Sequence, residues 1–188
     1  MSKQSGVTLL ELMVGIAVAA ILAMLAAPSF NRLIASTRLN TQTTELLSSL
    51  QYARTEALNR NQNVSVCRSP NPAAAPPACG VSNDNGTWAT GWLVFTDGGA
   101  AGVVDGTDQV LRVGQPAIAL VFDVPPRYSN WLGFSATGRP RAGVNGAANG
   151  TIILCNGVLR RAIRISIAGR ISRIDDAPDN ANCSTPIP

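Results

Sequence analysis

The stretch that decides the fold is residues 5–33, SGVTLLELMVGIAVAAILAMLAAPSFNRL. The residues from Leu12 to Phe30 include no charged side chain. As a helix, a run of this size is about long enough to cross the ~30 Å hydrocarbon core of a bilayer. Between Gly6 and Asn31 the one ionisable residue is Glu11, and a carboxylate inside a membrane-length segment costs at least ~2.5 kcal/mol unless something pairs with it. The segment therefore predicts a membrane stage, and Glu11 requires a partner.

The alternative for this stretch is a cleaved secretory signal. Such a signal needs a basic N-terminal region, a short apolar core and a small-x-small cleavage site. Only Lys3 is basic here, and the best cut, after Ala27, is followed by Pro28. The membrane-spanning interpretation is therefore favoured.

Helical periodicity continues beyond the apolar run. Apolar residues recur at steps of seven, four, three and four, at Leu39, Leu46, Leu50, Ala53 and Ala57. The polar side includes Thr43, Glu45, Ser48 and Ser49. The pattern predicts one helix from about residue 8 to 60, with an apolar stripe that packs on a globular head.

From residue 63 onward the sequence becomes a series of short β-type runs separated by Gly, Asn, Asp and Pro. The runs are VSVC, GWLVFTD, QVLRV, IALVF, WLGFSA, TIILC and RAIRISIAGRISRI. In the last run Ile163 and Ile165 alternate with Arg164, so the isoleucines should face a core and Arg164 solvent. The sequence predicts an α+β fold, with a long N-terminal transmembrane and spine helix packed on a β-rich head.

The composition argues against a hydrolase. The chain contains no histidine, so Ser-His-Asp and Cys-His arrangements are absent, and we expect neither enzymatic activity nor a cofactor or metal. Charge is uneven: residues 1–126 carry seven basic and eight acidic residues, whereas residues 127–188 carry eight arginines and three aspartates. The basic character therefore lies in the last third.

The loop TDGGAAGVVDGTDQ, residues 96–109, has three aspartates among glycines, which raises the question of calcium. An EF-hand needs alternating oxygen ligands, Gly at position six and Glu at position twelve, and this loop fits none of these. A Gly-rich hairpin is the favoured interpretation.

The N-terminus resembles the class III signal of type IV pilins and pseudopilins, which is a short polar leader ending in Gly before an apolar helix with Glu as its fifth residue. Here Gly6 ends the leader, Val7 would be the first mature residue, and Glu11 is fifth. The resemblance implies cleavage by a prepilin peptidase, a single pass through the bacterial inner membrane with the head in the periplasm, and later export to a pilus on the cell surface. It also implies that Glu11 pairs with the α-amine of a neighbouring pilin's Val7. The alternative is that Glu11 lies at the headgroup level of a plain anchor.

The rest of the chain is similar to the GspH/FimT group of minor pilins and pseudopilins, which includes FimU-like proteins. The matching pieces are LLSSLQYARTEALNRNQNVSVC, GWLVFTD followed by DQVLR, GFSATGRPR, and TIILC before an Arg-rich strand. The resemblance implies a leader at 1–6, a transmembrane and assembly helix at 7–30, its amphipathic continuation at 31–61 and a head at 62–188. It implies a minor pilin near the tip of a type IV pilus, with a type II secretion pseudopilin that contacts exported protein as the alternative.

Arginines near the C-terminus suggest DNA as a partner. Five fall within fourteen residues: Arg160, Arg161, Arg164, Arg170 and Arg173. On a strand Arg160 and Arg164 would share a face about 13 Å apart, within reach of successive phosphates. The alternative is an ordinary solvated face in an arginine-rich chain.

FimT-type minor pilins of naturally transformable bacteria resemble this region through a C-terminal G-R-x-R motif implicated in DNA binding. Gly169 and Arg170 match the motif, whereas Ser172 replaces its second arginine and Arg173 follows. A strict G-R-x-R, with Arg139 and Arg141, occurs in an earlier loop and could be a second basic contact.

The four cysteines indicate an oxidising compartment, and none has C-x-x-C spacing. Four cysteines allow three connectivities. We expect bridges Cys67–Cys79 and Cys155–Cys183, because each pair is nearest in sequence and brackets a loop or a chain terminus.

Overall fold

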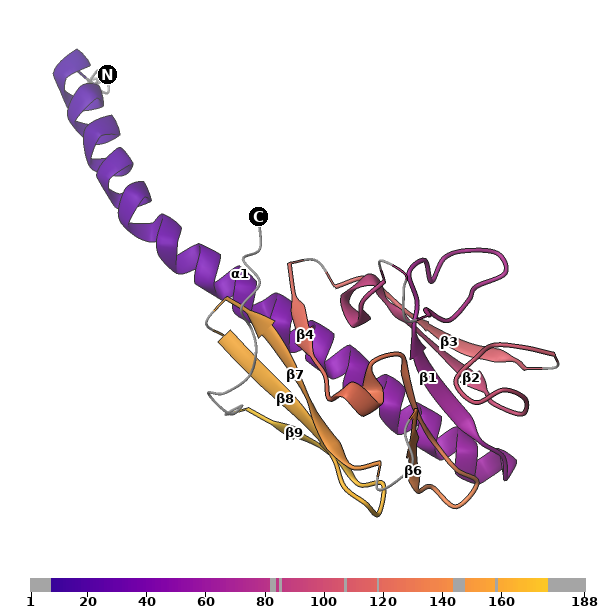
Figure 1. Cartoon of the computed structure of the whole chain (residues 1–188). Helices are drawn as coiled ribbons and strands as arrows, with labels where there is room; N and C mark the ends of the chain where they lie inside the picture. Colours follow the sequence, from indigo (N-terminus) through magenta and orange to yellow (C-terminus); the bar gives the residue numbers. More distant parts are fainter. Residues whose placement is uncertain are drawn as a thin grey trace, which may run out of the picture. The chain divides into compact units, whose positions relative to one another are not determined.

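A computed structural model of the chain describes residues 8–81, 84, 86–106, 108–117, 119–143, 148–157 and 159–175, without the side chains of residues 25–29. The chain divides into two compact units, residues 1–37 and 38–188. Helix α1, Leu9–Arg60, contributes to both units (Figure 1). The prediction of one helix from about residue 8 to 60 is confirmed.

The first unit is a helix whose described side chains are mostly exposed. Its described large apolar residues are exposed on every side of the helix, as Leu9 at 78%, Ile16 at 62% and Phe30 at 63% exposure show. Among the described residues, no helix is both long enough and apolar enough to cross a membrane. The segment predicted to do so, 7–30, includes residue 7 and the side chains of 25–29, which lie outside the described part.

In the second unit α1 buries the predicted apolar stripe. Its members are fully buried: Leu39, Leu46, Leu50, Ala53 and Ala57. Thr43 and Ser49, predicted on the polar side, are buried as well, so that part of the prediction is wrong. The Thr43 hydroxyl tolerates burial because it donates to the Leu39 carbonyl oxygen at 2.7 Å, one helical turn back.

The strands of the second unit form two sheets, and all of their pairings are antiparallel. One has the order β3-β2-β1-β5-β6 and the other β4-β7-β8-β9. Their bounds are β1 Val64–Arg68, β2 Trp92–Thr96, β3 Val110–Gly114, β4 Val121–Asp123, β5 Trp131–Phe134, β6 Pro140–Ala142, β7 Gly150–Asn156, β8 Leu159–Ile165 and β9 Ile171–Ile174. Two short 3-10 helices, η1 Trp88–Thr90 and η2 Pro126–Tyr128, lie between strands.

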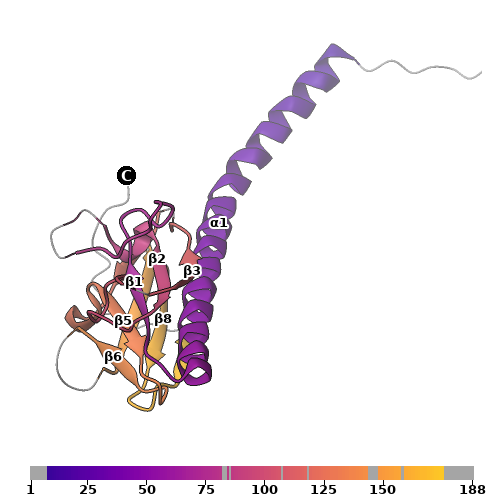
Figure 2. The same cartoon turned by 90° about the vertical axis from the view of Figure 1, so that its right-hand side faces the viewer.

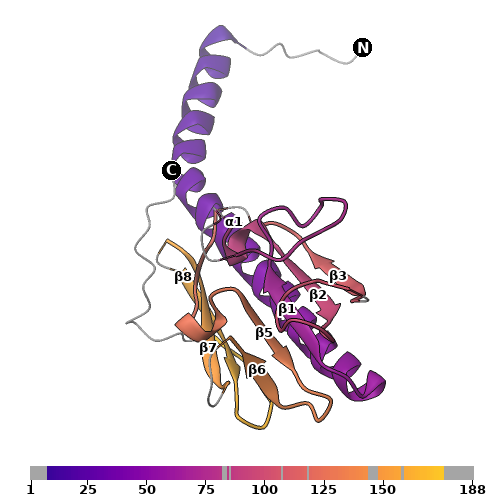
Figure 3. The same ribbon diagram turned by 45° about the vertical axis from the view of Figure 1, so that its right-hand side comes forward.

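Both sheets pack on the second half of α1, as Figures 2 and 3 show. A single cluster joins the helix stripe to Val66 and Val94 of the five-stranded sheet and to Ile152 and Ile163 of the four-stranded sheet. Burial of such side chains contributes roughly 1.5–3 kcal/mol each. The core therefore fixes both sheets against one helix face.

Two details of the strand prediction are wrong. β6 was not predicted, because it is three residues long and begins with proline, which is restricted to sheet edges and strand starts. The last run, predicted as one strand, is the hairpin β8–β9, which turns at Ser166–Arg170. The Gly-rich hairpin predicted for residues 96–109 is confirmed by the pairing of β2 with β3.

The predicted bridge Cys67–Cys79 is confirmed. It closes a twelve-residue separation between β1 and the loop after it, and Cys67 packs with Leu93 and Phe95 on the sheet face away from α1. Closing a loop of this length contributes about 2–4 kcal/mol. The second predicted bridge involves Cys183, which lies outside the described residues, so it stays a prediction.

Candidate nucleic-acid interface and assembly segment

Glu11 lies in the first turn of α1 and is exposed. Its backbone N–H donates to Thr8 Oγ1 at 3.2 Å, so Thr8 caps the helix. Within the described residues the Glu11 carboxylate has neither a hydrogen bond nor an ion pair. Gly6 and Val7, the predicted processing site, lie outside the described residues.

The arginines of β8 alternate between its two faces. Ile163 and Ile165 are buried and Arg164 is exposed, as predicted. Arg160 shares the face of Arg164, whereas Arg161 shares the face of the isoleucines, which is directed toward α1. Neighbouring arginines of the cluster therefore have different surroundings.

The side chains of Arg161 and Arg173 have hydrogen-bond and ion-pair partners within the protein. The oxygen Oδ1 of Asn40, on α1, accepts from Arg161 Nε at 3.2 Å and from Arg173 Nη2 at 2.8 Å. Asp175 forms ion pairs with both, with N–O distances of 3.5 Å to Arg161 and 2.7 Å to Arg173. Both guanidinium groups therefore have acceptors in the head itself and are less available to an external anion.

Arg141 also has partners within the head. Its Nη1 lies 3.3 Å from Oδ2 of the buried Asp97, and its guanidinium carbon lies 5.7 Å from the ring centre of Trp131. Asp97 Oδ2 accepts further hydrogen bonds from the Ser65 hydroxyl and the Gly102 N–H. Arg141 thereby ties β6 to the β2–β3 loop, which is a structural role.

The aspartates of that loop bind its own backbone. Asp108 Oδ1 accepts from the Gly98 N–H at 2.9 Å, and Asp105 Oδ2 accepts from the Ala100 N–H at 2.9 Å. These bonds organise a hairpin loop, in line with the favoured interpretation of the sequence.

Of the arginines predicted to bind DNA, three are exposed and, within the described residues, their side chains meet no acceptor. They are Arg139, Arg164 and Arg170. Arg139 and Arg170 directly follow Gly138 and Gly169, whose positive φ angles are 73° and 79° and which lie in the turns between the strands of two hairpins. These three guanidinium groups are available to an external anion.

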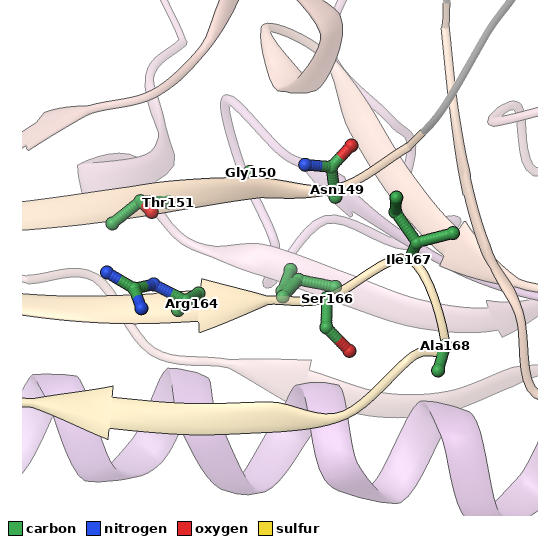
Figure 4. A pocket seen from close by; sticks show the side chains of 8 residues that line it. Asn149, Gly150, Thr151, Arg164, Ser166, Ile167 and Ala168 are labelled. Atoms are coloured by element: carbon green, nitrogen blue, oxygen red, sulfur yellow. The ribbon is translucent and has the colours of Figure 1, made fainter.

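Arg164 lies in an open pocket of about 490 Å³ at one end of the four-stranded sheet (Figure 4). It stands opposite Thr151 across the β7–β8 pair. The lining is Asn149, Gly150, Thr151, Arg164, Ile165, Ser166, Ile167 and Ala168. The pocket thus joins Arg164 to the turn that carries Arg170.

Arg68, which the sequence did not single out, organises the disulfide-closed loop. It is 5% exposed, donates from Nε to Asn130 Oδ1 at 3.1 Å and from Nη2 to the Val81 carbonyl oxygen at 2.6 Å, and forms an ion pair with Asp84. The hydrogen bond from Arg68 lowers the pKa of the Asp84 carboxyl below its ordinary value. Nothing in the local sequence distinguishes Arg68 from other strand-end arginines.

This ion pair predicts a pH-dependent stability. Because the pKa of Asp84 is lower in the folded protein, its contribution is fully present above the ordinary aspartate pKa and is lost as pH falls through the lowered value. Asp84→Asn should therefore lower the melting temperature at pH 7, and the difference from the unmodified protein should shrink toward pH 2. Thermal melts between pH 2 and 7 measure this, and a difference that stays constant with pH would contradict it.

Comparisons with known proteins match both parts of the chain. The family model "Type II transport protein GspH" matches residues 42–169, and the model "Prokaryotic N-terminal methylation motif" matches residues 1–27. No curated protein matches the chain.

The solved structures that resemble the chain include two crystal forms of the type IV minor pilin FimU from Pseudomonas aeruginosa strain PAO1. The form in space group P21 has a TM-score of 0.55 at 22% identity, and the match covers 77% of this chain and 95% of the chain in that crystal. The form in P65 has a TM-score of 0.53 at 21% identity, with coverages of 75% and 98%. At this identity the likeness shows a shared fold.

Proposed function

Because the chain belongs to the GspH family and carries the prokaryotic N-terminal methylation motif, we propose that it is a minor pilin of a type IV pilus. A prepilin peptidase cuts it after Gly6, residues 7–30 hold it in the bacterial inner membrane with its head in the periplasm, and it then joins the filament near the tip with other pilins. The observation that carries this proposal is Glu11, a carboxylate at the start of a helix whose described apolar side chains from Leu9 to Ile34 are exposed on all sides.

Local interactions alone do not offset the free-energy cost of placing the Glu11 carboxylate in an apolar segment. A carboxylate in the first helical turn gains about 0.3–1 kcal/mol from the helix dipole. Its cost within a membrane-length apolar segment is at least ~2.5 kcal/mol, so a further positive charge is required. The α-amine of a neighbouring subunit's Val7 provides this positive charge. The pairing also disfavours any packing register that leaves either charge unpaired.

The head of this subunit binds DNA weakly and without sequence preference, in support of DNA uptake during natural transformation. Support comes from Arg139, Arg164 and Arg170, which are exposed and, within the described residues, have no acceptor. Guanidinium groups bind phosphate through paired hydrogen bonds. Phosphate contacts position a protein on DNA but do not read its sequence.

A salt titration tests DNA binding. Full-length protein in nonionic detergent is titrated against a fluorescein-labelled duplex at several salt concentrations, with fluorescence anisotropy as the readout. With about three phosphates neutralised, log affinity should fall against log salt with a slope near −2 to −3. Duplexes of unrelated sequence should bind alike. Absence of binding at low salt would refute the DNA-binding part of the proposal.

A second candidate function is a minor pseudopilin of type II secretion, whose head contacts exported protein. The matching family, described as a type II transport protein, favours this candidate. The two candidates differ in filament association and in DNA retention. A subunit that is absent from sheared pili and does not bind DNA would favour the secretion role.

A further inference from the structure

Two turns from different sheets share one sequence pattern and one geometry. The β5–β6 turn is Ser135–Arg139, SATGR, and the β8–β9 turn is Ser166–Arg170, SIAGR. In each turn the glycine N–H donates to the serine carbonyl oxygen, at 2.7 and 2.8 Å, and the serine N–H donates to the arginine carbonyl oxygen at 2.9 Å. Both glycines have positive φ. These paired turns therefore present Arg139 and Arg170 from equivalent positions.

The paired turns touch each other. A Cβ atom added to Gly169 would lie 2.1 Å from the Gly138 carbonyl oxygen, so only glycine permits this approach. Since each arginine directly follows its glycine, and consecutive Cα atoms are 3.8 Å apart, the Cα atoms of Arg139 and Arg170 are at most about 11 Å apart. Two equivalent exposed arginines thus extend from adjoining turns.

Arg54, on α1, holds the paired turns together. Its Nε donates to the Gly138 carbonyl oxygen at 3.2 Å, and its Nη2 donates to the Ala168 carbonyl oxygen at 3.4 Å. One planar guanidinium can donate in two fixed directions, which an ammonium group does not do. Arg54 thereby fixes the spacing of the two turns.

We propose that the paired turns form a single site for the DNA backbone, in which Arg139 and Arg170 bind neighbouring phosphates of one strand and Arg54 is a positioning residue. This proposal rests on the proposed DNA binding and names its site. The pocket lined by Ser166 and Ala168 continues the site toward Arg164, which supplies a third contact farther along the strand. Preorganised guanidinium groups bind more tightly, because less conformational freedom is lost on binding.

The first test compares the two turns. Full-length protein in nonionic detergent is titrated with a fluorescein-labelled single-stranded oligo-dT at several salt concentrations. Arg139→Gln and Arg170→Gln should each reduce the salt slope by about 0.7, whereas Arg38→Gln, an exposed helix arginine, should not. If Arg170→Gln weakens binding and Arg139→Gln does not, the paired site is overturned while DNA binding stands. If the unmodified protein does not bind, the proposed function itself fails.

The second test distinguishes the positioning role of Arg54 from a contribution of its positive charge to DNA binding. Arg54→Lys keeps the charge but not the two-directional donation, so both Arg54→Lys and Arg54→Gln should weaken binding by about three- to tenfold. The salt slope should stay near that of the unmodified protein, because Arg139 and Arg170 remain. If Arg54→Lys binds normally, Arg54 acts through charge or not at all, and its positioning role is overturned. Circular-dichroism melts verify that each variant is folded.

The third test asks whether the site bridges two phosphates. Inorganic phosphate, added at constant ionic strength, should not displace the oligonucleotide, since isolated phosphates cannot span the two turns. Displacement at low phosphate concentration would show that the site binds single anions, and it would overturn the proposal that the site bridges two phosphates.

Discussion

Glu11→Val should leave the subunit inserted in the membrane but lower its incorporation into filaments at least tenfold. The substitution removes the carboxylate that pairs with a neighbouring α-amine, so that amine stays unpaired among apolar side chains and no register is preferred. Breaking a buried ion pair by removing one partner costs about 3–5 kcal/mol, and about 1.4 kcal/mol already corresponds to a tenfold change. Quantitative mass spectrometry of sheared filaments and of membranes measures the ratio of incorporated to inserted subunit.

Two further variants control this experiment. Glu11→Gln keeps the size of the side chain without its charge and should fail like Glu11→Val. Glu45→Gln alters a carboxylate of the same helix within the second unit, where Glu45 accepts from the Gln115 N–H and the amide oxygen of glutamine can also accept. It should assemble normally. Normal incorporation of Glu11→Val would show that Glu11 lies at the headgroup level of a plain anchor.

The double substitution Arg164→Gln and Arg170→Gln should weaken binding to duplex DNA by about ten- to a hundredfold at low salt, because hydrogen bonds to charged groups contribute about 1.5–3 kcal/mol each and exposure reduces this. The salt slope should become shallower by nearly two units, at about 0.9 per lost phosphate contact. Neither side chain has an acceptor within the described residues, so stability should change little. Anisotropy titrations and thermal melts measure both quantities.

The matched control removes the same charge elsewhere. Arg32 and Arg38 are exposed on α1, and their double substitution by glutamine should leave the salt slope unchanged. If the control weakens binding as much as the test pair, the protein attracts DNA through net charge alone. If neither pair affects binding, the C-terminal strands form an ordinary solvated face, and the secretion role becomes the better proposal.

Periodicity predicted the parts of the fold that depend on local sequence. The stripe from Leu39 to Ala57 and the alternation of Ile163, Arg164 and Ile165 follow from the repeats of helix and strand, and both are confirmed. β6 and the turn at Ser166–Arg170 were not predicted. A three-residue strand is too short to show a periodic pattern of apolar residues, and a short turn can lie inside a strand-like run.

The roles of individual arginines depend on residues far away in the chain. Arg161 resembles Arg164 in sequence, yet Asn40, 121 residues away, binds Arg161 and not Arg164. Arg54 likewise donates to the carbonyl oxygens of Gly138 and Ala168, which are 84 and 114 residues away in the sequence. Composition predicts a basic surface but does not indicate which guanidinium groups have partners in the fold. The S-x-x-G-R pattern, present at Ser135–Arg139 and Ser166–Arg170, is a sequence signal that could have indicated the paired turns.

The proposed function requires that this chain is processed after Gly6 and assembled as a pilin. The most direct test is mass spectrometry of the N-terminal peptide and the intact chain in sheared filaments and membranes. We predict a chain in the filament fraction that begins at Val7 and carries one methyl group on its α-amine. A chain that retains Met1, or one cut after Ala27, would refute processing after Gly6.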